Sequence, residues 1–235
     1  GPTRGLAIGP CSRSVTDAWL IGGSSLVGRL TTILLVNNDD RPAQVDLEIF
    51  GPDGQVSSPG ATGIVVAGAS TSRVSLATLA PNQPVTAVHV VAQSGRVGAS
   101  ALEFDSKGLV PQGVSAMSAS SSGRSLVIPM IPKRVVAARL VLLSPARDST
   151  AHVTLLTTEG AVTPVGFDSV ELAAGQVQAL DLTKALAGAP GGLVVKADGD
   201  IVAGVVVTTG SQDQLREGDK EAATPALTSP GLIAG

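Results

Sequence analysis

Aromatic and charged side chains are scarce in this sequence of 235 residues: it has one tryptophan, three phenylalanines and no tyrosine, and only 15% of its residues are charged. A hydrophobic core must therefore be built from valine, leucine, isoleucine and alanine, which help to make up a hydrophobic fraction of 43%. The β-branched members of this set favour strands. The composition thus predicts an aliphatic, β-rich chain.

Clustered positive charge is also missing. Lysines and arginines number 16 against 19 acidic residues, the net charge is −3, and no basic stripe stands out along the chain. This argues against nucleic acid and against a charged membrane surface as partners. No window approaches the roughly 18 consecutive apolar residues of a spanning helix. We therefore expect contact with a membrane only through a segment outside this sequence.

Catalytic and metal-binding residue types are sparse. The single cysteine, Cys11, excludes an internal disulfide. The two histidines, His89 and His152, lie in predicted strands at non-equivalent places in the repeat described below, so their spacing predicts no metal pair. Asn37 to Asp40 lack the ligand spacing of a calcium loop and are interpreted as a turn. We expect no enzyme, no cofactor and no metal.

A repeat organises the chain. Leu20-Ile21 recurs as Leu126-Val127 and as Leu232-Ile233, at a constant spacing of 106 residues. Other landmarks keep nearly the same spacing: Leu34-Leu35 matches Leu142-Leu143, 43–47 matches 151–155, and 95–97 matches 199–201. Such self-similarity indicates a duplicated structural unit.

Within a unit the hydrophobic period is two. Val45, Leu47 and Ile49 alternate with polar residues, as in a half-buried strand. Turn signals separate the apolar runs at 37–42, 51–54, 94–95 and 198–199. A single helical turn is expected at 77–81 and at 183–187, and the glycine-rich stretch 22–28 is expected to be a flexible loop.

These patterns predict an all-β chain of two tandem immunoglobulin-like β-sandwich repeats, with roughly seven strands each. The first repeat spans 13–110 and the second 123–210, and the serine-rich stretch 115–122 between them is a linker. Residues 211–235 form a tail that holds either the start of a third repeat or a strand that closes the second.

Four residues are candidates for an interaction surface. Trp19 has no aromatic counterpart in the second repeat, where Ser125 takes its place, and Arg41, Arg73 and Arg96 have no arginine counterpart. Two interpretations of Trp19 stay open: a plug in the core or between the repeats, and an exposed hot spot for binding. For the arginines, the alternative to a binding surface is a solvated strand face.

The chain also resembles a family of actinobacterial secreted or membrane-anchored proteins that is known only as a domain of unknown function. The features that carry the resemblance run over nearly the whole chain: Trp19 with Gly22-Gly23, Leu34-Leu35-Val36-Asn37, Gly51 with Gly54, Leu76 with Leu79-Ala80-Pro81, Gly95-Arg96-Val97, and Leu126-Val127-Ile128-Pro129. The resemblance implies a membrane anchor followed by an extracytoplasmic β-rich region, and it assigns no functional residues.

The expected function is a non-catalytic binding or scaffolding module of the cell envelope. Its partner is a protein or a cell-surface polysaccharide. The alternative is a carbohydrate-binding module acting on cell-surface polysaccharide, for which Trp19 would supply the stacking face.

Overall fold

The computed structural model describes residues 7, 9, 13–209, 224–230 and 232–233. Strands make up nearly all of its regular structure, so the predicted all-β class is confirmed. The first half of the chain contains β1 (Asp17–Gly23), β2 (Arg29–Asn37), β3 (Ala43–Gly51), β4 (Gly54–Val56), the 3-10 turn η1 (Pro59–Ala61), β5 (Ile64–Val66), β6 (Ser70–Ser75), α1 (Leu76–Leu79), β7 (Thr86–Ser94), β8 (Gly98–Lys107) and β9 (Val110–Ser118).

The second half repeats this series of elements. It contains β10 (Gly123–Ile131), β11 (Val135–Leu143), β12 (Ser149–Thr157), β13 (Gly160–Val162), β14 (Val170–Leu172), β15 (Val177–Asp181), α2 (Thr183–Leu186), β16 (Gly191–Thr209), β17 (Thr224–Pro230) and β18 (Leu232–Ile233). The helical turns α1 and α2 lie where the sequence predicts them.

Two antiparallel layers form the first half. One layer has the strand order β1-β7-β3-β4, with β5 also pairing β3, and the other follows β6-β2-β8-β9. The alternation predicted for β3 is confirmed, since Val45, Leu47 and Ile49 are buried between the layers. Burying one face of each sheet against the other is what gives a sandwich its core.

The second half has the same pairing order, as a comparison of the ladders shows. β10 and β12 pair the first part of β16, while β11 and β17 pair its second part. The single strand β16 thus occupies the positions in the second half that β7 and β8 occupy in the first. The expected turn at Asp198 and Gly199 is wrong, because the strand runs on through both residues from one layer into the other. A Cβ on Gly199 would lie 2.3 Å from Ser149 Oγ, so glycine gives the strand room to cross there.

The stretch expected to be a linker is largely a strand. Ser115 to Ser118 are buried in β9, and Met117 pairs in parallel with Thr228 of β17. The serine-rich composition that predicts a linker instead supplies small side chains to a covered strand. The second layer of the first half therefore extends beyond the predicted limit at residue 110.

The described part of the tail pairs with the second half. β17 continues the sheet beside β16, and β18 pairs Leu126 and Val127 of β10. Ser120 bridges Trp19 of β1 at the matching place after β9. β17 lies where a strand that closes the second half would lie, and the choice between the two alternatives for 211–235 stays a prediction. The domain limits and the specific likeness to immunoglobulin domains stay predictions.

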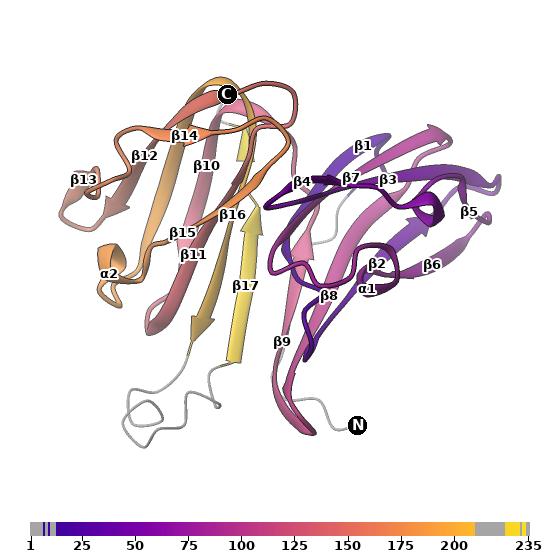
Figure 1. Cartoon of the computed structure of the whole chain (residues 1–235), viewed down its shortest axis with the longest axis horizontal. Coiled ribbons are helices and arrows are strands. Elements are labelled where there is room, and N and C mark those ends of the chain that lie inside the picture. The colour runs from indigo at the N-terminus through magenta and orange to yellow at the C-terminus, as the bar shows by residue number, and fades with distance from the viewer. Residues whose placement is uncertain (1–6, 8, 10–12, 210–223, 231, 234–235) are drawn as a thin grey trace.

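A third core cluster joins the two halves, which lie side by side in Figure 1. The outer face of the β1-β7-β3 layer contributes Trp19, Ile21, Phe50, Val85 and Ala87, and the second half contributes Val141, Leu143, Val177 and Val202. We call these nine residues the seam. Because the seam is apolar on both sides, the hydrophobic effect holds the halves against each other.

Candidate functional site

The outer face of β1, β7 and β3 continues from the seam into a polar site. Trp19 pairs across the strands with His89, and His89 pairs with Glu48. The ring of His89 lies flat on the indole of Trp19, with a centroid distance of 4.1 Å and an interplanar angle of 4°. The ring of Phe50 is tilted against the indole, with a centroid distance of 5.7 Å. The sheet register therefore places the imidazole at the rim of the seam.

Two carboxylates hold the imidazole of His89. Its Nδ1 lies 2.8 Å from Glu48 Oε2, and its Nε2 lies 2.8 Å from Asp17 Oδ2. Both ring nitrogens are therefore engaged by side chains, which fixes the orientation of the imidazole at the rim of the seam.

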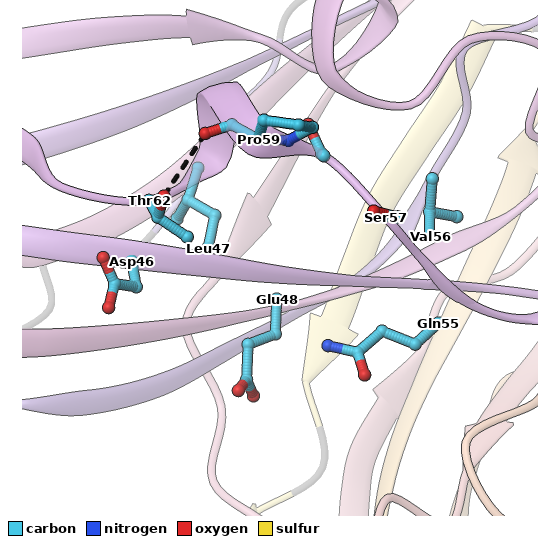
Figure 2. A pocket seen from close by; sticks show the side chains of 9 residues that line it. Asp46, Leu47, Glu48, Gln55, Val56, Ser57, Pro59 and Thr62 are labelled. Atoms are coloured by element: carbon cyan, nitrogen blue, oxygen red, sulfur yellow. Dashed lines mark hydrogen bonds between the residues drawn. The ribbon is translucent and has the colours of Figure 1, made fainter.

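A hollow of about 490 Å³ opens beside Glu48 (Figure 2). It exists because β4 pairs residues 49–51 of β3 and β5 pairs residues 43–45, which leaves 46–48 without a neighbouring strand at that edge. The turn η1 spans the gap. The lining residues are Asp46, Leu47, Glu48, Gln55, Val56, Ser57, Ser58, Pro59 and Thr62.

The chemistry of the hollow combines acid and amide groups with apolar walls. Asp46 is fixed in place, since its Oδ1 accepts a hydrogen bond from Gly63 N at 2.7 Å and its Oδ2 accepts one from Gln93 Nε2 at 2.9 Å. Glu48 turns toward His89. Two carboxylates near Val56 and Pro59 suit a ligand that carries a cation on an apolar stem, such as a lysine or arginine side chain.

The structure does not bring the four residues predicted as an interaction surface together. Trp19 is 4% exposed and packs in the seam, where a plug between the two halves would lie and where an exposed hot spot would not. The plug forms because the second half covers this face of the sheet.

The three arginines are exposed on two different parts of the first half. Arg41 and Arg96 lie on adjacent loops, since Gly95 approaches Ala43 so closely that a Cβ there would lie 2.8 Å from the Cβ of Ala43. Arg73 lies on β6, at the edge of the other layer. A binding role for these three residues stays a prediction.

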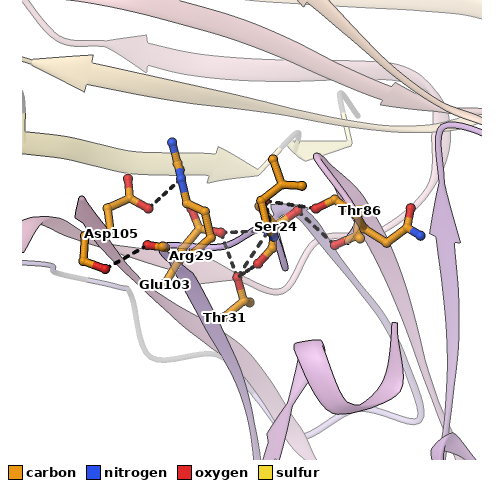
Figure 3. A network of polar contacts seen from close by, with 11 residues as sticks. Ser24, Arg29, Thr31, Thr86, Glu103 and Asp105 are labelled. Carbon is orange, nitrogen blue, oxygen red and sulfur yellow. Dashed lines mark hydrogen bonds and ion pairs between the residues drawn. The ribbon is translucent and has the colours of Figure 1, made fainter. Parts of the chain in front are cut away.

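A buried polar network lies at one end of the first half (Figure 3). Arg29 NH1 donates to Glu103 Oε1 at 2.9 Å, and Arg29 Nε lies 2.8 Å from Asp105 Oδ1 as an ion pair without hydrogen-bond geometry. Thr31 Oγ1 and Ser24 N each lie 2.7 Å from Glu103 Oε2. Glu103 is thus a buried charge with several partners, as buried charges require.

Asp105 is the residue of this network whose pKa is raised. Burial raises the pKa of its carboxyl from 3.8 to about 6, and the nearby charge of Glu103 raises it too, whereas Arg29 and Arg139 act in the opposite direction. Near neutral pH the fold holds this carboxyl close to its titration point.

The same network orders the stretch 22–28, which the sequence predicts to be a flexible loop. Ser24 and Ser25 are buried, Ser24 Oγ donates to Gln83 O at 3.0 Å, and Gln83 N donates to Ser25 Oγ at 2.9 Å. Residues 24–28 form the expected loop between β1 and β2, and its serines satisfy their polar atoms by bonding distant backbone, which a local pattern does not reveal.

The other residues considered in the sequence, Asn37 and His152, make contacts within their own turns and with nearby backbone. Asn37 closes its turn by donating from Nδ2 to Arg41 O at 2.8 Å, and Asp39 N donates to its Oδ1 at 3.0 Å. His152 is exposed, and its Nδ1 contacts the backbone oxygen of Asp168. Cys11 lies outside the described residues. Within 13–209 no three His, Cys, Asp or Glu side chains gather as metal ligands would.

The fold and the site define an all-β protein of two sandwich-like halves joined by an apolar seam, with a preformed acidic hollow beside it. The chain belongs to the family described as "Family of unknown function (DUF5719)", whose model matches residues 1–234. No curated protein and no solved structure matches the chain. In the described part of the chain, no helix has the length and apolar character needed to cross a membrane.

Proposed function

We propose that this protein is a non-catalytic binding or scaffolding module of the actinobacterial cell envelope. It lies outside the cytoplasm and is associated with the membrane. The observation that carries the binding role is the hollow at the open edge of β3, with Asp46 fixed by two donors and Glu48 held by His89. Such a preformed polar pocket suits recognition.

The partner that fits this hollow best is a protein segment with an exposed lysine or arginine. A cation entering beside Asp46 and Glu48 gains charge-assisted hydrogen bonds, and its alkyl stem packs on Val56 and Pro59. The backbone of residues 46–48 lies at an open strand edge, where an extended segment finds further hydrogen bonds. The extracytoplasmic and envelope parts of the proposal rest on the sequence resemblance.

Pull-down from envelope extracts tests this proposal. The bait is the whole chain, compared with the double variant Asp46→Asn/Glu48→Gln, which keeps the shape of the hollow and removes its charge. The matched control is Asp53→Asn/Glu159→Gln, which removes the same charges from exposed turns elsewhere. We expect a partner that the wild type and the control retain and the hollow variant loses. Recovery of no partner across varied salt and detergent, or equal recovery by all three baits, contradicts the proposal.

The alternative, a carbohydrate-binding module, has weaker support. Sugar rings stack on exposed aromatic faces, but Trp19, Phe50 and Phe167 are buried and Phe104 is half-buried. A glycan array separates the two candidates. Binding that disappears in Trp19→Ala, in a variant whose circular dichroism is unchanged, would replace the protein-binding proposal.

A further inference from the structure

The seam uses one outer sheet face of each half and leaves one outer face of each half over. From the first half it takes the outer face of β1, β7 and β3, and from the second half it takes the outer face of β15, β11 and the second part of β16. The two faces left over are those of β10, β16 and β12 in the second half and of β6, β2 and β8 in the first. Figure 1 shows β12 and β6 at opposite ends of the molecule.

The remaining face of the second half carries a row of side chains across three strands. Val127 of β10 pairs with Val194 of β16, and Val194 pairs with Thr154 of β12, so these three side chains point to the same side of the sheet. Leu156 stands two residues after Thr154 on that side and is 39% exposed. The residues between them in the strands, such as Leu193, point into the core. We call Val127, Thr154, Leu156 and Val194 the distal face.

The remaining face of the first half carries larger apolar side chains. On β2 the outward positions alternate with Ile33 and Leu35, which are buried between the layers. β8 pairs with β2 over the whole of this stretch, and Leu30 lies opposite Phe104, so the outward side chains of the two strands form one surface. Leu30 is 52% exposed, and the others are partly exposed. We call this set the lateral face: Leu30, Leu34, Val36, Leu102 and Phe104.

Neither face is part of a core within the described residues. None of the nine side chains of the distal and lateral faces belongs to one of the three buried clusters, although all of them except Thr154 are apolar. Single exposed apolar residues need no explanation, whereas apolar side chains that are neighbours in a ladder mark a surface for association.

The repeat shows what covers a face of this kind. Val127 stands 106 residues after Ile21, and Ile21 forms the same kind of row across its sheet with Ala87 and Phe50. That row of the first half is buried by the layer of β15, β11 and β16. The layer of the first half that corresponds to β15, β11 and β16 is the layer of β6, β2 and β8, which carries the lateral face. The distal and lateral faces are thus the counterparts of the two sides of the seam.

We propose that the distal face of one copy of the chain binds the lateral face of a second copy, so that the packing of the seam is repeated between molecules. The two faces do not meet within one chain, because they lie at opposite ends of it (Figure 1). A contact between two unlike faces is heterologous, so each bound copy still presents one free face and further copies add head to tail. Burial of aliphatic side chains drives the contact, as it does in the seam. This assembly goes beyond the binding role proposed above and does not use the hollow.

Sedimentation velocity of the whole chain tests self-association. We expect the wild type to form species larger than one chain as its concentration rises from about 1 µM to about 1 mM, the range of weak protein contacts. Leu156→Glu places a charge on the distal face and Leu34→Glu places one on the lateral face, and each variant is expected to stay monomeric over that range. A wild type that stays monomeric throughout overturns the proposal.

The control separates the two faces from the rest of the surface. Val165→Glu is the matched variant, because Val165 is 102% exposed on the loop between β13 and β14, outside both faces. It is expected to associate as the wild type does, and an equal loss of association in this control contradicts the proposal. If circular dichroism shows that Leu34→Glu is unfolded, Leu30→Glu replaces it, since the more exposed Leu30 tolerates a charge more readily.

Mixing the two variants tests whether unlike faces pair. Leu156→Glu keeps an intact lateral face and Leu34→Glu keeps an intact distal face, so an equimolar mixture is expected to form a dimer that neither variant forms alone. Growth stops at the dimer, because both of its free faces carry the introduced charge. Light scattering after size-exclusion chromatography measures the mass of the complex.

Two outcomes of the mixing experiment contradict the proposal. A variant that still dimerises alone shows that like faces pair, and a mixture that stays monomeric shows that the two faces do not bind each other. A monomeric wild type that instead captures another envelope protein through these faces assigns them to a different partner and also overturns the proposal. None of these measurements involves the hollow, so their outcome is separate from that of the pull-down.

Discussion

Trp19 combines three roles in one side chain. Its indole fills the seam, supports the ring of His89 and packs against Phe50, while its backbone exchanges hydrogen bonds with Ser120. An aromatic ring contributes both buried area and ring contacts. A residue with so many partners is not replaced by a smaller one without a cavity.

The first prediction concerns this cavity. Trp19→Ala is expected to lower the free energy of unfolding by about 3–5 kcal/mol, because a fully buried large aromatic side chain is removed. Urea titration followed by far-ultraviolet circular dichroism measures the change. Trp19→Phe, which keeps a ring in the seam, serves as the control and should lose clearly less. Equal stability of Trp19→Ala and the wild type would show that the seam contributes nothing.

The second prediction concerns Asp105. Because the fold raises the pKa of this carboxyl from 3.8 to about 6, the folded chain binds its proton more tightly than the unfolded chain does. Its contribution to stability is therefore greatest below pH 4 and falls as the pH rises from about 4 to about 6. Asp105→Asn is expected to remove this fall, so its stability relative to the wild type grows across that range.

Urea midpoints at pH 4, 5, 6 and 7 for the wild type and Asp105→Asn measure this difference. Asp181→Asn is the control without a pH trend: hydrogen bonds from Thr183 lower the pKa of Asp181 below 3.8, so its contribution to stability is present at all four pH values. A constant difference between the wild type and Asp105→Asn at all four pH values contradicts the prediction.

At the scale of elements, the close approach of the loop 24–28 to β8 depends on one glycine. Gly28 has a φ of +87° and faces Ser106 O, whereas Gly108 has a φ of +58° and open space around it. The two positions share a left-handed backbone, so a comparison of their alanine variants isolates the effect of crowding.

The third prediction follows from this pair. Gly108→Ala is expected to cost about 1–2 kcal/mol of stability for its backbone conformation alone. Gly28→Ala is expected to cost about 1–3 kcal/mol more, since its new methyl group forces the loop away from β8. Thermal unfolding of both variants measures the difference. If the two variants unfold at the same temperature, the loop and the strand are not in close contact.

Elements with a strong local pattern are predictable from the sequence. The alternation of Val45, Leu47 and Ile49 defines β3, and the helical turns follow from their place in the repeat. β16 is not predictable in this way, because Asp198 and Gly199 have the composition of a turn while tertiary pairing keeps them in a strand. β9 is missed for a similar reason: its small residues signal a linker unless β17 is known to lie beside it.

The candidate site could be predicted only in part. Glu48 and His89 each stand at an outward position of a predicted strand, and Asp17 begins β1, but only the register of three strands brings them together. The hollow depends on a gap between β4 and β5, which no residue pattern reports. Arg29, Glu103 and Asp105 escape detection because charged residues are expected at the surface.

At the scale of the whole molecule, the seam and the bridge between β9 and β17 make the two halves one structure. The outer face that holds Trp19 is covered only when the second half is present. The fourth prediction is that a fragment of residues 1–122 exposes this tryptophan, because Val141, Leu143, Val177 and Val202 are removed from it.

Acrylamide quenching of tryptophan fluorescence measures this exposure without interference, since Trp19 is the single tryptophan. We expect a larger quenching constant and emission at longer wavelength in the fragment than in the whole chain. Circular dichroism of the fragment must show retained strand signal for the comparison to hold. The same quenching constant in both proteins, with the fragment folded, would mean that the halves do not cover each other.

Hydrogen bonds restrict the angle between the groups that they join, whereas aliphatic packing requires only that two surfaces complement each other in shape. The seam consists of side chains such as Ile21, Val141 and Val202, which carry no directional groups. The seam thus leaves the tilt of one sandwich against the other to side-chain volume and to the bridge between β9 and β17. Exchanging a valine for an isoleucine in the seam is therefore expected to change how far the hollow of the first half stands from the surface of the second.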